Sequence, residues 1–118
     1  MNLKTFTYPE EKKLKSRKLI KQVFEDGKTI KAFPLLIRYT EHEGELHKVG
    51  VSVSKRNFKT AVDRNRIKRQ LREAYRLHQQ ELTDSGSKFA VMLIYIGRKK
   101  MPTVKIQETL STLLKELK

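Results

Sequence analysis

The longest uninterrupted apolar run in the chain, residues 89–96, constrains the fold more than any other segment. It is far shorter than the roughly 20 residues that a membrane-spanning helix needs. A short run that is apolar at every position is typical of a strand buried on both faces. The chain has 118 residues, which is enough for one core. We therefore expect a single domain, residues 1–118, built around one central strand.

A helix and two or three strands are predicted before residue 60. Ser16 is expected to cap a helix whose apolar residues recur at helical spacing up to Phe24, and Gly27 is expected to close it as the C′ residue. Residues 35–40 read as a strand. Residues 49–54 alternate valine with glycine or serine, which predicts a strand with one apolar face and one small, polar face. Residues 41–45 between them are expected to form a hairpin turn.

The remaining segments complete an α+β fold. A long helix is expected over residues 60–82, a loop over 83–87 and an amphipathic helix over 103–118. Residues 1–12 lack periodicity and are expected to be a flexible tail. The segments predict a compact α/β sandwich with a mixed, four-stranded sheet and the order α-β-β-β-α-β-α.

The charge of the chain points to a polyanionic partner. Lys and Arg number 27 against 13 Asp and Glu, a net charge of +14. Half of the excess lies in residues 55–76, which have nine basic and two acidic residues. The chain has no cysteine, which excludes a disulfide scaffold, a thiol nucleophile and cysteine zinc sites. Its first residues have no apolar core of the signal-peptide kind, so we expect a cytoplasmic protein without a membrane partner.

The long helix carries this charge on one side. At helical spacing, one arc is apolar and contains Ile67, Leu71, Ala74, Tyr75, His78 and Leu82; another contains Asn65, Lys68, Arg69, Arg72 and Arg76. The simpler explanation is a solvated face stabilised by ion pairs, but only Asp63 and Glu73 are available to pair with nine cations. Arginine also suits phosphate oxygens. A polyanion site is therefore the favoured interpretation.

The architecture favours RNA over DNA. Helices that read DNA usually belong to small helical domains or to dimers, whereas this basic helix follows a strand in a domain with a sheet.

The sequence of residues 49–76 resembles the protein component of bacterial ribonuclease P. The similarity is nearly continuous over three parts: the Val-Gly-Val-Ser-Val-Ser strand, the pair Lys55-Arg56, and the helix around Arg64-Asn65-Arg66. Weaker similarity covers the rest of the chain. The resemblance implies a left-handed crossover in the strand–helix–strand unit, against the usual right-handed rule.

The resemblance also implies a function. The family assists a catalytic RNA in the Mg²⁺-dependent removal of 5′ leaders from precursor tRNA. The partners would be that RNA subunit and precursor tRNA, with no obligate protein partner. The Mg²⁺ would be bound mainly by RNA, and the chain would have no catalytic residue, metal site or cofactor of its own.

Positions that match the family's motifs give the expected site residues. The RNA-binding set is Lys55, Arg56, Lys59, Arg64, Asn65, Arg66, Lys68, Arg69, Arg72 and Arg76. A cleft between the first helix and the sheet would receive the single-stranded leader through Ile20, Phe24 and Tyr39, with Ile20 where an aromatic is common. Arg98 and Lys99 form a secondary basic site. Spacing alone favours core positions for Phe24 and Tyr39, and the resemblance makes stacking on RNA an equal alternative. Arg64 could either reach RNA or pack on the sheet.

The histidines are weaker candidates for a metal or catalytic site. His42 and His47 are five residues apart around a glycine, whereas two ligands on one helix face need a spacing of four. His78 lies on the apolar arc, which favours a packing role.

Two functions remain as alternatives to a ribonuclease P subunit. One is a general RNA-binding or ribosome-associated module, which explains the charge equally well. The other is an autonomous nuclease, for which no array of acids or histidines is evident.

Overall fold

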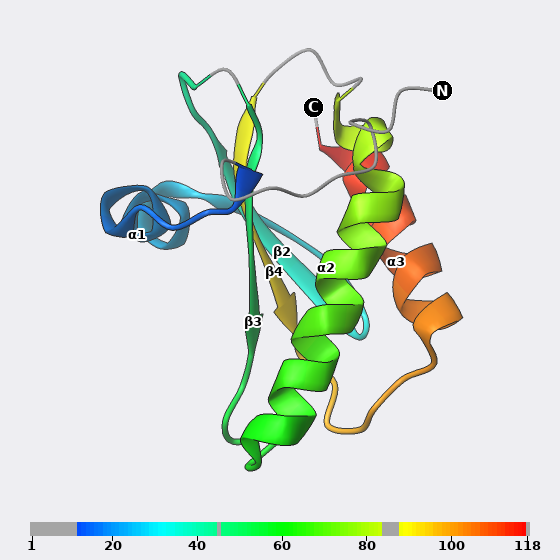
Figure 1. Cartoon of the computed structure of the whole chain (residues 1–118). Helices are drawn as coiled ribbons and strands as arrows, with labels where there is room; N and C mark the ends of the chain where they lie inside the picture. Colours follow the sequence, from blue (N-terminus) through cyan, green and yellow to red (C-terminus); the bar gives the residue numbers. More distant parts are fainter. Residues whose placement is uncertain (1–11, 45, 84–87, 118) are drawn as a thin grey trace.

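The computed structural model describes residues 12–44, 46–83 and 88–117. Within these residues the elements are α1 (Arg17–Asp26), β1 (Lys28–Ala32), β2 (Leu35–Glu41), β3 (Lys48–Val53), α2 (Ala61–Thr83), β4 (Phe89–Tyr95) and α3 (Thr103–Glu116) (Figure 1). This is the predicted order of helices and strands. Lys12, assigned to the tail, donates from Nζ to Gln79 Oε1 at 3.0 Å; the rest of the tail and most of the 83–87 loop lie outside the described residues.

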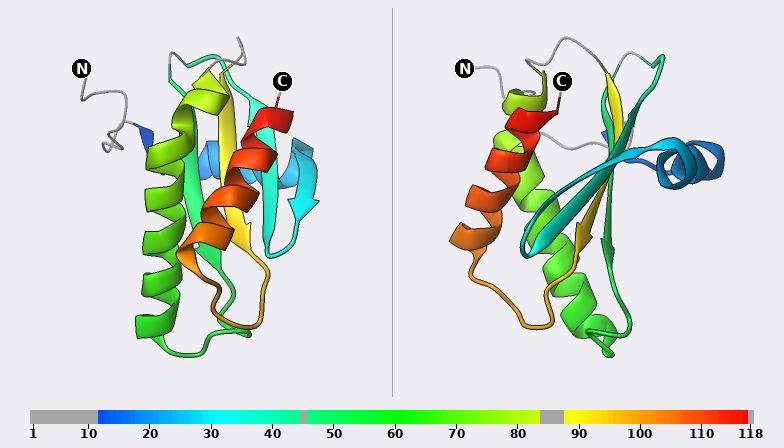
Figure 2. Two further views of the ribbon diagram at one scale, coloured as in Figure 1. Left: turned by 90° about the vertical axis from the view of Figure 1, so that its right-hand side faces the viewer. Right: turned by 180° about the vertical axis from the view of Figure 1, so that it is seen from behind.

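The four strands form one mixed sheet in the order β1-β2-β4-β3. β4 is antiparallel to β2 and parallel to β3. Apart from Ile94, which is partly buried, every residue of β4 is buried. Helices α2 and α3 cover one face of the sheet and α1 lies on the other (Figure 2). The prediction that the longest apolar run forms a central strand covered on both sides is confirmed.

The unit formed by β3, α2 and β4 has the left-handed crossover that the family resemblance implies. In the left view of Figure 2, where α2 and α3 face the reader, the chain descends β3, ascends α2 and descends β4 to the right of β3. A right-handed connection would place β4 on the other side of β3.

The hairpin predicted at residues 41–45 is wrong. β2 and β3 are not neighbours, because β4 lies between them and pairs with both. Glu41 still belongs to β2, where it pairs with Phe89. The reason is burial: β4 is the most apolar strand, and the central position is the one in which both of its faces leave water.

The main core lies between the sheet and helices α2 and α3. The predicted apolar arc of α2 supplies Ile67, Leu71, Ala74, Tyr75 and Leu82, all buried, whereas His78 is partly exposed. They meet alternate residues of β2, β3 and β4 and the apolar stripe of α3, including Ile37, Val49, Leu93, Leu110 and Leu114. These contacts fix the position of α2 and leave its other side to solvent.

A smaller cluster lies on the α1 face. It consists of Leu14, Val23, Ala90 and Met92, with Leu19, Ile20 and Ile94 at its border. As predicted, Ser16 caps α1, accepting at Oγ from the Leu19 N–H (3.3 Å). Gly27 ends the helix with extended backbone rather than the left-handed conformation usual at C′. Glycine is needed there for space, because a Cβ would lie 2.1 Å from the Val23 carbonyl oxygen.

In the described ranges, no helix combines the length and the apolar character that crossing a membrane requires.

Candidate nucleic-acid interface

The first turn of α2 is fixed by polar contacts. Thr60 Oγ1 accepts a hydrogen bond from the Asp63 N–H at 3.2 Å. The Asp63 carboxylate pairs with Lys100 Nζ at 2.7 Å, and the hydrogen bond from Lys100 lowers the pKa of this carboxyl below its usual value. The pair joins the start of α2 to the segment between β4 and α3. Two basic segments that are distant in sequence are thereby held together.

Arg64 supports the loop before α2. Its Nη1 donates to the carbonyl oxygens of Phe58 (2.8 Å) and Lys59 (2.9 Å). Phe58 itself is buried and packs on Tyr95, with ring centroids 5.8 Å apart. Of the two roles that the sequence leaves open for Arg64, the geometry favours a structural one, because these bonds shape the loop that carries Lys55, Arg56 and Lys59.

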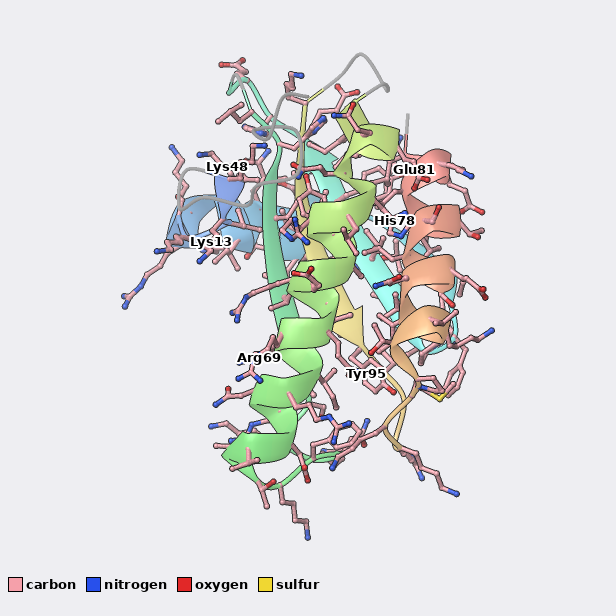
Figure 3. All side chains as sticks on the ribbon, turned by 45° about the vertical axis from the view of Figure 1, so that its right-hand side comes forward. Lys13, Lys48, Arg69, His78, Glu81 and Tyr95 are labelled. Atoms are coloured by element: carbon pink, nitrogen blue, oxygen red, sulfur yellow. The ribbon has the colours of Figure 1, made fainter. Side chains whose placement is uncertain are left out.

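Most of the predicted basic arc of α2 faces solvent. The side chains of Asn65, Arg66, Arg69 and Arg72 are exposed and that of Lys68 is partly exposed. Figure 3 shows Arg69 on the side of α2 that is turned away from α3. A rigid helix thus presents several planar guanidinium groups, which can each bind a phosphate through two N–H donors.

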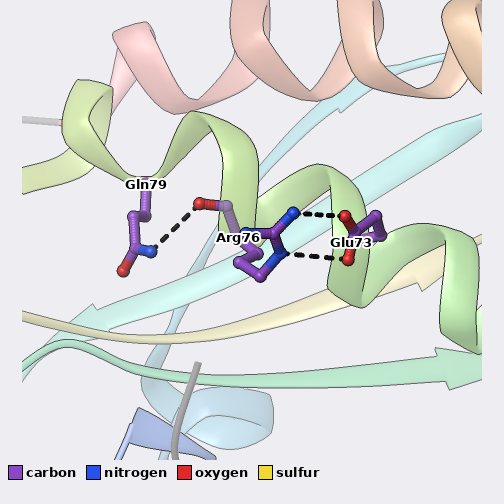
Figure 4. A network of polar contacts seen from close by, with 3 residues as sticks. All are labelled: Glu73, Arg76 and Gln79. Atoms are coloured by element: carbon purple, nitrogen blue, oxygen red, sulfur yellow. Dashed lines mark hydrogen bonds and ion pairs between the residues drawn. The ribbon is translucent and has the colours of Figure 1, made fainter. Parts of the chain in front are cut away.

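Arg76 differs from the rest of the arc because it is paired. Its Nε donates to Glu73 Oε2 at 3.1 Å and its Nη2 to Glu73 Oε1 (Figure 4). The two groups shift each other's titration: the hydrogen bond lowers the pKa of Glu73 and raises that of Arg76. Gln79 Nε2 donates to the Arg76 carbonyl oxygen at 3.0 Å. Arg76 would have to exchange this carboxylate for a phosphate in order to bind RNA.

The secondary basic site is continuous with the loop before α2. Lys55, Arg56 and Lys59 are exposed, as are Arg98 and Lys99. Arg56, Asn57 and Arg98 line a shallow cavity of about 300 Å³. Asn57 Nδ2 donates to the Gly97 carbonyl oxygen at 3.4 Å and so joins the two loops. The structure brings together cations that the sequence placed in separate groups.

A second surface lies beside α1, at the β3 edge of the sheet. A cleft of about 250 Å³ has an apolar floor that includes Leu14, Ile20, Gly50 and Met92, while Lys13, Lys15 and Arg72 contribute cationic side chains. Gly50 deepens it, since a Cβ would lie 3.1 Å from Met92 Cε. Phe24, one turn along α1 from Ile20, is 43% exposed. An apolar floor flanked by cations suits a single nucleic-acid strand, which offers both bases and phosphates.

The assignment of Tyr39 to this cleft is wrong. Tyr39 pairs with Val91, and both side chains point to the α2/α3 side of the sheet, opposite α1. The Tyr39 ring packs edge-on against buried Phe89, with centroids 5.7 Å apart. The β2 residue next to it, Arg38, points to the α1 side instead and donates to α1 carbonyl oxygens. Of the three expected cleft residues, Ile20 lines the cleft, and Phe24 lies one turn further along α1.

Several cleft residues were missed by sequence reasoning, although a signal existed. The small, polar face predicted for residues 49–54 contains Gly50, and a strand that leaves one face without bulk forms the floor of a groove. Strict alternation from Leu35 and Ile37 places Tyr39 on their side and Arg38 on the other. The resemblance to the family points to the cleft because Tyr39 matches an aromatic position, whereas the alternation points to the core.

The histidines have structural surroundings. His47 is buried, its Nδ1 accepts from the Phe89 N–H at 3.0 Å, and its ring stacks on Phe89. Burial, followed by the positive charge of Lys88, lowers its pKa to about 4. His78 Nδ1 lies 3.8 Å from Glu81 Oε1, between α2 and α3. Among the described residues, no three or more His, Asp or Glu side chains gather as a metal ion would require.

Comparison with known proteins identifies the family. The model of the Ribonuclease P family matches residues 8–118. The chain belongs to the ribonuclease P protein family. The curated ribonuclease P protein component of Porphyromonas gingivalis is 41% identical over 83 residues, which cover 68% of this chain and 61% of that protein. That of Dictyoglomus thermophilum is 38% identical over 79 residues, covering 67% and 65%. These alignments thus span less than two thirds of the relatives' own length.

Solved structures of ribonuclease P proteins share the fold. The Staphylococcus aureus protein superposes with a TM-score of 0.74 at 25% identity, covering 88% of this chain and 93% of that one. The Thermotoga maritima protein has a TM-score of 0.78 at 20% identity, covering 90% and 97%. The fold class predicted from the sequence is therefore confirmed for nearly the whole chain.

Proposed function

We propose that this chain is the protein subunit of a ribonuclease P holoenzyme. In this role it assists a catalytic RNA in the Mg²⁺-dependent removal of the 5′ leader from precursor tRNA, and the RNA holds the Mg²⁺ and performs the hydrolysis. The observation that carries the proposal is the pairing of two different surfaces on one small domain. One is a rigid cationic surface on α2 and the adjoining loops, and the other is an apolar cleft with cationic side chains.

The cationic surface suits the RNA subunit. We assign to it Asn65, Arg66, Lys68, Arg69 and Arg72 of α2, together with Lys55, Arg56, Lys59, Arg98 and Lys99 of the two loops. Each phosphate that these residues neutralise releases counterions, which makes binding fall with salt by about 0.7 to 0.9 in the log–log slope. Exposed arginines on one rigid helix bind without the entropy cost of ordering a loop.

The cleft suits the leader. Ile20, Gly50 and Met92 offer an apolar floor, and Phe24, one turn along α1 from Ile20, has an exposed ring. Lys13 and Lys15 supply positive charge, as does Arg72, which the cleft shares with the cationic surface. Bases of a single strand stack on such platforms with little regard to sequence, each for about 1 to 3 kcal/mol. The chain's part in catalysis is then to hold substrate and offset phosphate repulsion. The proposal includes a cytoplasmic location, in keeping with a chain that has no cysteine.

Reconstitution tests the proposal. Purified protein is combined with a bacterial ribonuclease P RNA and a precursor tRNA over a range of Mg²⁺ concentrations, with each component omitted in turn. We expect cleavage at low Mg²⁺ only when protein and RNA are both present, and a protein-dependent gain that shrinks as Mg²⁺ rises. Tight RNA binding without stimulated cleavage would instead indicate a general RNA-binding module, and cleavage by the protein alone a nuclease.

A further inference from the structure

We propose that Arg38 is a positioning residue for the leader cleft. By holding the last turn of α1 against the sheet, it sets the direction of the Phe24 side chain, and with it the preference for tRNA that carries a leader. This inference rests on the proposed function, since it concerns the cleft assigned to the leader.

The polar contacts of Arg38 converge on the end of α1. Its Nη2 donates to the carbonyl oxygens of Phe24 (2.7 Å) and Gly27 (3.2 Å), and its Nη1 donates to Thr29 Oγ1 (2.8 Å). Carbonyl groups at a helix C-terminus lack helical partners and carry partial negative charge, so a cation there is stabilising. The last turn of α1 has no basic residue of its own. A residue of β2 therefore supplies the cation that caps α1.

Apolar packing alone holds α1 loosely. Val23 is the buried residue of this helix, whereas α3 buries five, among them Ile106, Leu110 and Leu113. The hydrogen bonds from Arg38 therefore make up a large part of what holds the end of α1 on the sheet. Their loss would leave the last turn anchored by Val23 alone and would free the backbone at Phe24 and Gly27 to shift.

The last turn is also the part that presents Phe24. Arg38 binds the carbonyl oxygen of Phe24, while the Phe24 ring is 43% exposed. Fixing the backbone of this residue limits the directions in which its ring can point. Arg38 is partly exposed, but its Nε is buried and both of its Nη atoms donate to acceptors of the chain itself, so the guanidinium is engaged within the protein rather than offered to a ligand. Its effect on RNA should therefore pass through α1.

Arginine is suited to this position by geometry. Its planar fork reaches Thr29 on one side and two carbonyl oxygens on the other, which the single nitrogen of a lysine cannot do in the same arrangement. Arg38→Lys preserves the charge and weakens the bonds, and Arg38→Met removes both and keeps the aliphatic stem. Lys31→Met is the matched control. Lys31 pairs with Leu36 on β2, so its exposed side chain is on the same face as Arg38.

The test is a double-mutant cycle in the reconstituted holoenzyme. Dissociation constants are measured for precursor and mature tRNA with Arg38→Met, Phe24→Ala and the double variant. We expect Arg38→Met to raise the constant for precursor tRNA on the order of tenfold, within the range of one lost stacking contact, and that for mature tRNA less than about twofold. When Phe24 is already alanine, Arg38→Met should add less than about twofold, because the two residues act on one contact.

Arg38→Lys should lie between wild type and Arg38→Met, and it supplies the same comparison if Arg38→Met fails to fold. Lys31→Met should change neither constant. Losses that simply multiply in the double variant, or that are equal for precursor and mature tRNA, would overturn the positioning role while leaving the proposed function intact. A wild-type holoenzyme that does not prefer precursor to mature tRNA would instead refute the assignment of the cleft itself.

Discussion

The two faces of the sheet differ in how they are covered. On one face α2 and α3 bury a continuous core whose residues extend along the chain from Leu35 to Leu117. On the other face a single short helix buries Val23 over a small cluster with Leu14, Ala90 and Met92. A guanidinium from the sheet holds the end of that helix. The first arrangement excludes water and stabilises the fold, while the second leaves an apolar groove partly open.

This contrast explains how one small domain can be both stable and able to bind. A fully covered sheet would gain stability but would have no groove, and a chain of this size has little apolar surface to spare. The covered face also makes α2 rigid, so the exposed side of α2 presents its cations in a fixed pattern. The predictions below test whether stability and binding divide between the two faces in this way.

The largest expected difference in stability is between variants at two neighbouring residues of β4. Leu93 points into the main core and Met92 into the α1 cluster. Leu93→Ala should lower the free energy of unfolding by about 2 to 5 kcal/mol, because it leaves a cavity in a close-packed region. Met92→Ala should cost less than half as much, since its surroundings are open to solvent and can adjust. Urea unfolding measures both, and equal losses would mean that the two faces contribute alike.

His47, which stacks on Phe89 of the main core, should make the stability of the fold sensitive to acid. Its pKa is lowered to about 4 in the folded state from an ordinary value of 6.5, so the neutral form is the folded one. The stability that His47 contributes is fully present above pH 6.5 and is lost as the pH falls toward 4, on the order of 3 kcal/mol in total. In His47→Asn, which keeps an acceptor for the Phe89 N–H, unfolding measured between pH 7 and 4 should depend less on pH. An unchanged slope would contradict the buried, neutral His47.

The exposed side of α2 should affect RNA binding and leave stability alone. Replacing Arg66 and Arg69 by alanine should weaken binding to the RNA subunit on the order of tenfold or more, and should reduce the log–log salt slope by about 1.4 to 1.8, if each contacts one phosphate. The urea midpoint should stay close to that of wild type. Lys105→Ala, an exposed lysine of α3, is the control for the change in charge. Unfolding of the double variant with unchanged RNA affinity would make these arginines structural.

The smallest expected effect is at the floor of the cleft. In Gly50→Ala the new methyl would lie 3.1 Å from Met92 Cε, a flexible end that can move. The fold should therefore persist while the cleft becomes shallower, and affinity for precursor tRNA should fall a few-fold with mature tRNA unaffected. A loss of unfolding free energy without any change in binding would place Gly50 in the packing of the sheet rather than in a binding floor.

Much of this fold could be predicted from local pattern. The apolar run of residues 89–96, the two-sided long helix and the Ser16 cap all follow from the spacing of side chains, which the backbone geometry obeys closely. The predicted hairpin at 41–45 failed because strand neighbours depend on which strand buries most surface, a property of the whole sheet. Spacing also could not show that Arg98 lies beside Arg56, since that depends on how two loops meet.

The candidate site was predicted only in part, because contacts between side chains also depend on the whole fold. The exposed arc of α2 follows from helical periodicity, but Arg76 has Glu73 as its partner and Arg64 supports a loop, and both contacts depend on side-chain geometry. Tyr39 was misplaced although alternation along its strand was sufficient to exclude it from the cleft. Arg38 was overlooked because a charged residue within a strand has no function that spacing can reveal.

The most direct test of the division between the two faces compares Phe24→Ala with Tyr39→Ala in the holoenzyme. For each variant the ratio of the dissociation constants for mature and precursor tRNA is measured alongside the free energy of unfolding. Phe24→Ala should reduce the ratio by the equivalent of about 1 to 3 kcal/mol, one stacking contact, with little loss of stability. Tyr39→Ala should leave the ratio unchanged and destabilise the fold, because Tyr39 packs on Phe89 in the main core. A reduced ratio in Tyr39→Ala, or an unchanged one in Phe24→Ala, would contradict the account.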